Sequence, residues 1–281
     1  MPGRNILPFH KKETNGGNAA NTRNSDGTHH IKPLTAHFVA ATGEFVGTFF
    51  FLWLAFAGHL MSVTQSAAPA AQGSGAAATT VIYISLSYGI SLLVTVWGMY
   101  RISGGLFNPA VTLGLVLTGT LPPLRGLFLF PAQLLGGMVA GGLVSCMFPG
   151  DIQTVNTLLA PGVSIAQGVF IEMFLTSLLI FIVLMLAAEK SKDTFIAPIG
   201  IGLALFICEI AGVYYTGGSL NPTRSFGPAV AGAYFPGYHW IYWVGPFLGS
   251  LLAAGYFRFV KFFNYEEVNP GQDSAGGDFE D

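Results

Sequence analysis

The sequence has few charged residues. Lysine, arginine, aspartate and glutamate make up 9% of its 281 residues, while 52% are hydrophobic, and an ordinary soluble domain is about a quarter charged. So few charges would not cover the surface of a water-soluble fold of this length. Several apolar stretches are instead long enough to cross a bilayer core of roughly 30 Å. The composition therefore predicts a membrane protein that crosses the bilayer several times.

Other scarcities exclude further classes of protein. The two cysteines, Cys146 and Cys208, both lie in apolar runs, which predicts neither a disulfide framework nor a metal site. The N-terminal segment lacks the apolar core of a secretory signal. The histidines are tail or loop residues or, like His37 and His59, are isolated near helix ends. With no nucleophile beside a base and a net charge of −2, we expect no enzyme, no cofactor, no metal and no nucleic-acid partner.

Six apolar segments are long enough to form membrane-spanning helices, at residues 36–62, 79–99, 124–147, 166–187, 195–213 and 240–262. Two shorter apolar pieces begin at Asn108 and Asn221 and are too short to span a bilayer. The N-terminal tail, residues 1–34, is polar and basic, and disorder is expected there. We therefore divide the chain into that tail, one membrane domain at residues 35–263 and an acidic C-terminal tail at residues 264–281.

The basic residues predict the orientation in the membrane. If the N-terminus lies in the cytoplasm and six spans follow, eleven of the twelve lysines and arginines fall on the cytoplasmic side. The positive-inside rule then places both termini in the cytoplasm. Arg224 is the exception, and it needs an explanation of its own.

The chain also repeats itself. A shift of 113 residues superposes two Gly-Gly pairs, two Asn-Pro pairs and several small residues of the apolar segments. Glu44 in the first span matches Glu172 in the fourth at a different offset. Each half, residues 36–147 and 166–262, has three spans and one short piece, and an odd number of spans inverts the second half in the membrane. The two short pieces are therefore expected to enter from opposite faces and to meet near the midplane.

Both short pieces begin with Asn-Pro, a pair that suits a helix N-terminus. Proline is preset for the first helical position, and asparagine caps the helix end. Irregular backbone inside a membrane is buried in protein or lines a watery cavity, so the two pieces predict a cavity. Two helix N-termini that meet there disfavour cations, while water accepts hydrogen bonds from the asparagine amides. The alternative, an Asn-Pro that merely starts a helix or turn, does not account for two copies at the repeat offset.

The two loops resemble the signature loops of the aquaporin family. They read Ser103-Gly-Gly-Leu-Phe-Asn108-Pro-Ala-Val-Thr-Leu-Gly114 and Tyr215-Thr-Gly-Gly-Ser-Leu-Asn221-Pro-Thr-Arg-Ser-Phe-Gly-Pro228. The resemblance covers about residues 36–263, and the length and tails are most similar to those of fungal members. It implies an all-α membrane protein with six transmembrane helices and two re-entrant half-helices in an inverted repeat, assembled as a homotetramer with one pore in each protomer. The pore region would contain Asn108, Pro109, Ala110, Asn221, Pro222 and Thr223.

The resemblance also implies roles for three charged residues. Arg224 matches the arginine of the family's outer constriction, where its guanidinium donates to passing water and repels cations. The alternative is an arginine whose side chain reaches to the outer interface. Glu44 and Glu172, which are carboxylates inside spans, would accept hydrogen bonds from the loop backbones and hold the loops in place.

The expected constriction departs from the family pattern. Counting back from the Asn-Pro pairs gives Tyr88 where water channels usually have phenylalanine, Glu209 where they usually have histidine, and Gly218 where cysteine or threonine is frequent. Gly218 removes bulk, and Thr223 replaces the usual alanine of the second triplet. An arginine favours the charged form of a nearby carboxylate, so we predict a Glu209–Arg224 pair, direct or bridged by water. The alternative is that Glu209 turns aside and bonds to backbone.

Three other positions favour water as the permeant. Ser225 lies where glycerol-conducting relatives have aspartate, and Tyr242 and Trp243 match the aromatic pair of water-selective members. The altered constriction leaves open a pore for small neutral solutes such as glycerol, urea or hydrogen peroxide. A membrane scaffold with a closed pore is a third reading. A coupled transporter is disfavoured, because short twin half-helices indicate a static pore.

The expected setting is the plasma membrane, with membrane lipids and permeating water as partners. The basic N-terminal tail invites three readings. It could close the inner mouth of the pore, as the tails of fungal relatives can, hold anionic lipid at the inner leaflet, or simply be solvated.

Overall fold

The fold is built from helices of two lengths. The computed structural model describes residues 32–67, 76–189 and 192–268, so most of both predicted tails lies outside the described residues. The long helices are α1 (Pro33–Ser66), α2 (Ala76–Met99), α4 (Pro123–Met147), α5 (Ile165–Val183), α6 (Ala197–Thr216) and α8 (Ile241–Phe262). The short helices are α3 (Pro109–Leu117) and α7 (Pro222–Ala231). The described ranges contain no strand, and the predicted all-α fold is confirmed.

Each predicted span coincides with one long helix. A π-helical turn, η3 (Leu184–Ala188), extends α5, and the 3-10 turn η4 (Lys192–Ile196) leads into α6. Two further 3-10 turns are η2 (Ile152–Val155), before α5, and η5 (Tyr265–Glu267), after α8. Five of the long helices are long and apolar enough to cross a membrane by length and composition. The sixth, α8, has 22 residues, which also suffices at 1.5 Å per residue for a core of roughly 30 Å.

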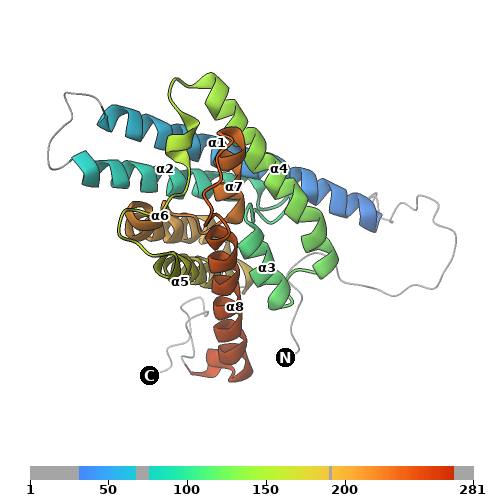
Figure 1. The fold of residues 1–281 in the computed structure, drawn as a ribbon. Helices are drawn as coiled ribbons and strands as arrows, with labels where there is room; N and C mark the ends of the chain where they lie inside the picture. The colour runs from blue at the N-terminus through green and yellow to red at the C-terminus, as the bar shows by residue number, and fades with distance from the viewer. Residues whose placement is uncertain (1–31, 68–75, 190–191, 269–281) are drawn as a thin grey trace.

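The helices pack in pairs that follow the internal repeat. The most extensive contacts join α2 to α6, α5 to α8 and α1 to α4. In Figure 1, α1 and α2 lie side by side, and α5 and α6 lie beside each other below them, with α6 next to α2. The first-half pair α1–α4 and the second-half pair α5–α8 correspond under the repeat, while α2 and α6 join the halves.

Glycines at repeat-related positions allow these helices to approach closely. A Cβ atom on Gly89 of α2 would lie 2.9 Å from the carbonyl oxygen of Gly202, and one on Gly202 would lie 2.7 Å from that of Gly89. A Cβ on Gly136 of α4 would lie 3.0 Å from the Thr48 Cβ, and one on Gly249 of α8 would lie 2.8 Å from the Thr176 Cβ. Small residues at such crossings are how membrane helices pack tightly. The repeat therefore extends to the helix crossings.

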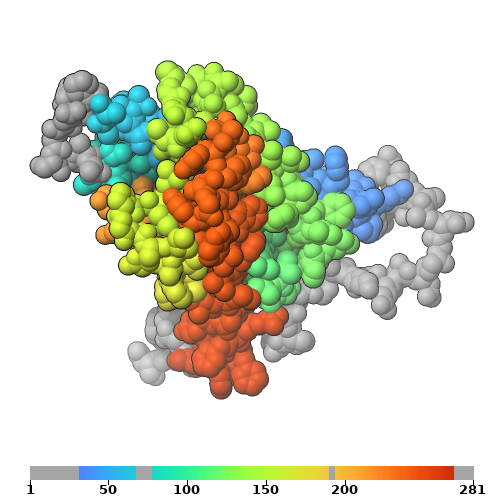
Figure 2. Space-filling view, in the orientation of Figure 1, coloured from blue at the N-terminus to red at the C-terminus, as the bar shows by residue number. Residues whose placement is uncertain are grey.

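Much of the outer surface is apolar, as expected for a surface that faces lipid. Large hydrophobic side chains are exposed on every long helix, among them Phe38, Trp97, Leu127, Phe174, Leu203 and Tyr256. Figure 2 shows one face of the molecule, where α8 lies between α5 on one side and α3 and α4 on the other.

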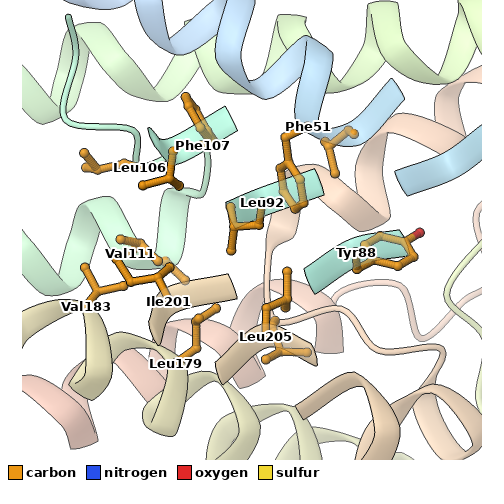
Figure 3. Packing of buried hydrophobic residues seen from close by; sticks show 14 of the residues in the cluster. Phe51, Tyr88, Leu92, Leu106, Phe107, Val111, Leu179, Val183, Ile201 and Leu205 are labelled. Carbon is orange, nitrogen blue, oxygen red and sulfur yellow. The ribbon is translucent and has the colours of Figure 1, made fainter. Parts of the chain in front are cut away.

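The buried apolar cluster lies between the two halves. It includes Phe51 from α1, Leu92 from α2, Val111 from α3, Leu179 from α5 and Leu205 from α6 (Figure 3). Tyr88 lies at the edge of this cluster, and its hydroxyl group points away from the other labelled side chains. The cluster thus ends at a polar region.

Candidate functional site

The two half-helices begin with the same cap. Asn108 and Asn221 have extended backbone, and each Oδ1 accepts a hydrogen bond from a backbone N–H two residues on, Ala110 at 2.8 Å and Thr223 at 2.9 Å. Proline follows at the first helical position in both. Asparagine satisfies one of the orphan N–H groups of each N-terminus, and proline has no N–H there to leave unsatisfied.

The same asparagines join the two loops to each other. The Asn108 Nδ2 donates to the carbonyl oxygen of Leu220 at 2.8 Å, and the Asn221 Nδ2 donates to that of Phe107 at 2.9 Å. Phe107 and Leu220 both have positive φ angles, of 53° and 49°, a conformation that costs non-glycine residues free energy. The helix N-termini of α3 and α7 are therefore fixed tip to tip, each with its positive dipole end at the meeting point.

Glu44 holds the first loop. Its Oε1 accepts from the Ser103 hydroxyl at 2.7 Å and from the Leu106 N–H at 3.0 Å. Its Oε2 accepts from the Phe107 N–H at 2.7 Å and from the Gln133 amide at 2.8 Å. This buried carboxylate of α1 thus connects the loop before α3 to α4.

Glu172 holds the second loop in the same way. Its Oε1 accepts from the Thr216 hydroxyl at 2.6 Å and from the Ser219 N–H at 3.0 Å, and its Oε2 accepts from the Leu220 N–H at 2.8 Å. The position that corresponds to Gln133 is Pro246, which has no side-chain donor. The second carboxylate therefore has one fewer partner.

Arg224, on α7, is 1% exposed, and carbonyl oxygens surround its guanidinium. Nε donates to the Gly218 oxygen at 2.9 Å, Nη1 to the Val155 oxygen at 2.7 Å and Nη2 to the Gly217 oxygen at 3.1 Å. The guanidinium carbon lies 4.7 Å from the centre of the Tyr88 ring. Since Nη1 carries two N–H groups, one of them has no partner among the described residues.

The structure brings together the four residues expected at the constriction. Arg224 contacts the Tyr88 ring and the Gly218 carbonyl. The carboxyl group of Glu209 lies directly against Gly218, because a Cβ built on Gly218 would collide with the Glu209 Oε2. Glu209 and Tyr88 are both 0% exposed. We refer to Tyr88, Glu209, Gly218 and Arg224 as the constriction.

The direct form of the predicted Glu209–Arg224 pair is wrong, and the water-bridged form stays a prediction. Among the described residues, the ion pairs are those of Lys261 with Glu189 and Glu266. Both carboxyl oxygens of Glu209 are buried without a hydrogen-bond partner in that part of the chain, so the alternative of a bond to backbone does not hold either. The reason is that carbonyl oxygens already occupy the Arg224 donors on the loop side, while Gly218 leaves a space that the carboxyl group fills.

The expectation that Gly218 removes bulk from the constriction is wrong for the same reason. The volume without a side chain at position 218 is taken by the carboxyl group of Glu209. Glycine at position 218 and glutamate at position 209 therefore compensate each other in volume. Their combined effect is to place a carboxyl group in the constriction.

His59 was expected to be an isolated residue near a helix end, and that interpretation is also wrong. The side chain is buried, and its Nδ1 lies 3.4 Å from the Tyr88 hydroxyl and 3.4 Å from the Arg224 Nη2. A signal was present in the sequence: His59 continues the helical spacing of Leu52, Ala55 and Phe56, which are also buried. A histidine on the inward stripe of a span is a candidate for a polar pathway.

The remaining predicted positions surround the second loop. The Tyr242 hydroxyl donates to the Thr216 carbonyl oxygen at 2.9 Å, and the Ser225 and Ser219 hydroxyls lie 2.6 Å apart. Trp243 lies away from the constriction, in an aromatic cluster with Phe130, Phe226 and Phe247. Thr223 is buried, and its hydroxyl lacks a partner among the described residues. Tyr242 and Ser225 thus support the loop.

Within the described ranges, no group of three or more histidine, cysteine, aspartate or glutamate side chains is placed to bind a metal ion. The polar groups of the site are hydrogen-bond donors and acceptors: asparagine amides, one guanidinium, one carboxyl, one imidazole and the loop carbonyls.

Comparisons with known proteins agree with this architecture. The family model described as "Major intrinsic protein" matches residues 33–257. The chain is 62% identical over 247 residues to "Probable aquaporin-3" of Gibberella zeae, covering 88% of this chain and 86% of that protein. It is 54% identical over 241 residues to "Aquaporin-7" of Botryotinia fuckeliana, covering 85% of this chain but 53% of that longer relative.

A solved structure shares the fold. The X-ray structure of the aquaglyceroporin from Plasmodium falciparum matches with a TM-score of 0.70 at 21% identity, over 83% of this chain and 100% of that one. At this identity the match supports the arrangement of helices and says nothing of the permeant.

Proposed function

Because this chain belongs to the major intrinsic protein family of membrane channels, we propose that it conducts water passively and excludes protons and ions. The observation that carries the proposal is the pair of asparagine amides at the tip-to-tip junction of α3 and α7. Each Nδ2 donates one hydrogen bond to the opposite loop, and an amide nitrogen carries two N–H groups. One donor on each asparagine is therefore free for a passing molecule.

These donors and the two helix N-termini set the polarity at the junction. A water molecule there presents its oxygen to both amides, so its own hydrogens point away along the pore in both directions. Hydronium and metal cations meet two positive dipole ends instead, which disfavours them. Neutral water passes under these conditions, while a positive charge does not.

The constriction supplies a second barrier. Arg224 is held by two carbonyls of its own loop and by that of Val155 in η2, and it keeps one N–H group for the permeant. Because the Glu209 carboxyl fills the space beside Gly218, the opening is not enlarged by the missing side chain at that position. This supports water over a solute of glycerol's size.

One observation favours a second candidate, a pore for small neutral solutes that donate hydrogen bonds. Both oxygens of Glu209 lack a protein partner in the described part of the chain, and burying a carboxyl group without hydrogen bonds is costly. A permeant such as urea or hydrogen peroxide would satisfy them with its N–H or O–H groups. Water does so as well, and it needs less room.

We also propose a homotetramer in the plasma membrane with both termini in the cytoplasm. The order of the helices supports the orientation, because the helix ends that would face the cytoplasm carry basic residues at or near them: Lys32, Arg101, Arg125, Arg258 and Lys261. The proposed tetramer rests on the family resemblance. The role of the N-terminal tail as a gate, a lipid contact or a solvated segment stays open, and most of the tail lies outside the described ranges.

Stopped-flow shrinkage of vesicles that contain the purified protein tests the function. We expect rapid shrinkage under an impermeant osmolyte and no faster uptake of glycerol or urea than in protein-free vesicles. Uptake of either solute would favour the wider pore. Shrinkage and uptake that both match protein-free vesicles would instead point to a closed-pore scaffold.

A further inference from the structure

α1 contributes a polar residue to the constriction, in addition to its support of the first loop. Phe56 and His59 lie one helical turn apart on α1, and both face Arg224. The Arg224 guanidinium carbon is 5.9 Å from the centre of the Phe56 ring, and the Arg224 Nη2 is 3.4 Å from the His59 Nδ1. The His59 ring also stands edge-on to the Tyr88 ring, with centres 6.0 Å apart.

The partner of His59 determines which of its nitrogens is protonated. A guanidinium group donates hydrogen bonds and accepts none. In the contact with Arg224, the His59 Nδ1 therefore acts as the acceptor and carries no proton. Neutral imidazole has one N–H group, so the proton is on Nε2. The Tyr88 hydroxyl, 3.4 Å from the same Nδ1, is placed to donate to it as well.

This assignment leaves one donor on His59 without use. The Nε2 atom has no hydrogen-bond partner among the described residues, and His59 is buried, with 5% of the residue exposed. Arg224 also keeps one N–H group on Nη1. Two donors thus remain on the neighbouring residues His59 and Arg224. The unpartnered oxygens of Glu209 are acceptors in the same constriction.

We propose that His59 is a specificity-determining residue of the constriction, which holds Arg224 through Nδ1 and presents its Nε2–H to the permeant. The family pattern places a histidine at the position that Glu209 occupies, so the imidazole in this chain comes from α1 instead of α6. The permeant class that fits is a small uncharged molecule that accepts from Arg224 and His59 and donates to Glu209. This inference rests on the proposed channel function for its effect on flux.

The first test compares two variants of His59 in reconstituted vesicles. His59→Ala leaves space beside Arg224 and removes the acceptor for Nη2, so the ratio of glycerol to water permeability is expected to rise about tenfold, a factor typical of one lost steric contact. His59→Gln keeps an amide acceptor and an amide donor, and we expect it to recover most of the lost discrimination. His37→Gln, the same change on the same helix but beside Phe128, is the matched control.

The second test does not depend on flux. In lipid bilayers, ¹⁵N-histidine NMR distinguishes the two imidazole tautomers, and the signal that is missing from His59→Gln identifies His59. We expect an unprotonated Nδ1 and a protonated Nε2 at neutral pH. This result is expected even if the vesicles pass no water, so a failure of the proposed function is distinguishable from a failure of the inference.

Three results would overturn the assignment. One is a protonated Nδ1 on His59, because that nitrogen then has no lone pair for Arg224. The second is a glycerol-to-water permeability ratio in His59→Ala equal to that of the parent. The third is a ratio in His59→Gln that is raised as much as in His59→Ala.

Discussion

The carboxyl group of Glu209 occupies the space in which a side chain on Gly218 would lie. A Cβ on Gly218 would collide with the Glu209 Oε2, and the carboxyl is fully buried. Glu209 comes from α6, while Gly218 lies in the loop that leads to α7. The two residues therefore determine the width of the constriction together, and neither can be interpreted alone.

The first prediction concerns the width. Gly218→Ala forces the Glu209 carboxyl out of its place, and we expect water permeability to fall clearly because the displaced carboxyl group narrows the constriction. Gly105→Ala is the matched control. The φ angle of Gly105 is +68°, close to the +61° of Gly218. A Cβ on Gly105 would lie 3.2 Å from the backbone of α2 and would not meet a carboxyl group.

Both variants place alanine in a left-handed backbone conformation, which costs about 1–2 kcal/mol. A difference in water flux between them therefore measures the effect of displacing the Glu209 carboxyl group. Adding Glu209→Ala to Gly218→Ala should restore water permeability. Equal flux in Gly218→Ala and Gly105→Ala would contradict the shared use of space.

The second prediction separates the volume of Glu209 from its charge. Glu209→Ala empties the space beside Gly218, and we expect glycerol permeability to rise about tenfold or more. Glu209→Gln keeps the volume, and glycerol should stay excluded. Light scattering after a glycerol gradient measures the glycerol permeability of both variants. If glycerol permeates Glu209→Gln as fast as Glu209→Ala, the charge of Glu209 controls glycerol exclusion instead of its volume.

The third prediction concerns the support of the second loop. Glu172 accepts three hydrogen bonds from Thr216, Ser219 and Leu220, and its replacement by alanine leaves two buried backbone N–H groups unsatisfied. Each such group costs about 1–3 kcal/mol, so the unfolding temperature in detergent should drop clearly. Glu189→Ala, which removes an ion pair with Lys261 at the end of the bundle, should cost no more than about 1 kcal/mol.

Equal unfolding temperatures for the two variants would mean that the loop is held by other contacts. The most direct of these are the cross-loop bonds of Asn108 and Asn221.

The sequence predicted the architecture because the architecture follows from local patterns. Apolar length indicates each span, and Asn-Pro indicates the start of each half-helix. The offset of 113 residues indicates the repeat, and the odd number of spans in each half indicates the inversion. The repeat extends to single hydrogen bonds, since Leu106 N–H to Glu44 corresponds to Ser219 N–H to Glu172. Counting from the Asn-Pro pairs also located the four residues of the constriction.

The contacts inside the constriction could not be predicted, because they depend on distances between segments far apart in the chain. Arg224 is satisfied by Val155, which lies in η2, and by the carbonyls of its own loop, and no residue pattern indicates where carbonyl oxygens point. His59 was missed because it lies 165 positions from Arg224. Only the packing of α1 on α2 and α4 brings it to the site.

The measurement that tests the central claim most directly records water and proton flux in the same vesicles. Light scattering follows osmotic shrinkage, while an internal pH dye follows acidification under a proton gradient. If the junction of α3 and α7 passes water and excludes protons, water permeability will be well above that of protein-free vesicles and acidification no faster than in those vesicles. Water permeability at the protein-free level, or acidification that increases with the amount of protein, would contradict it.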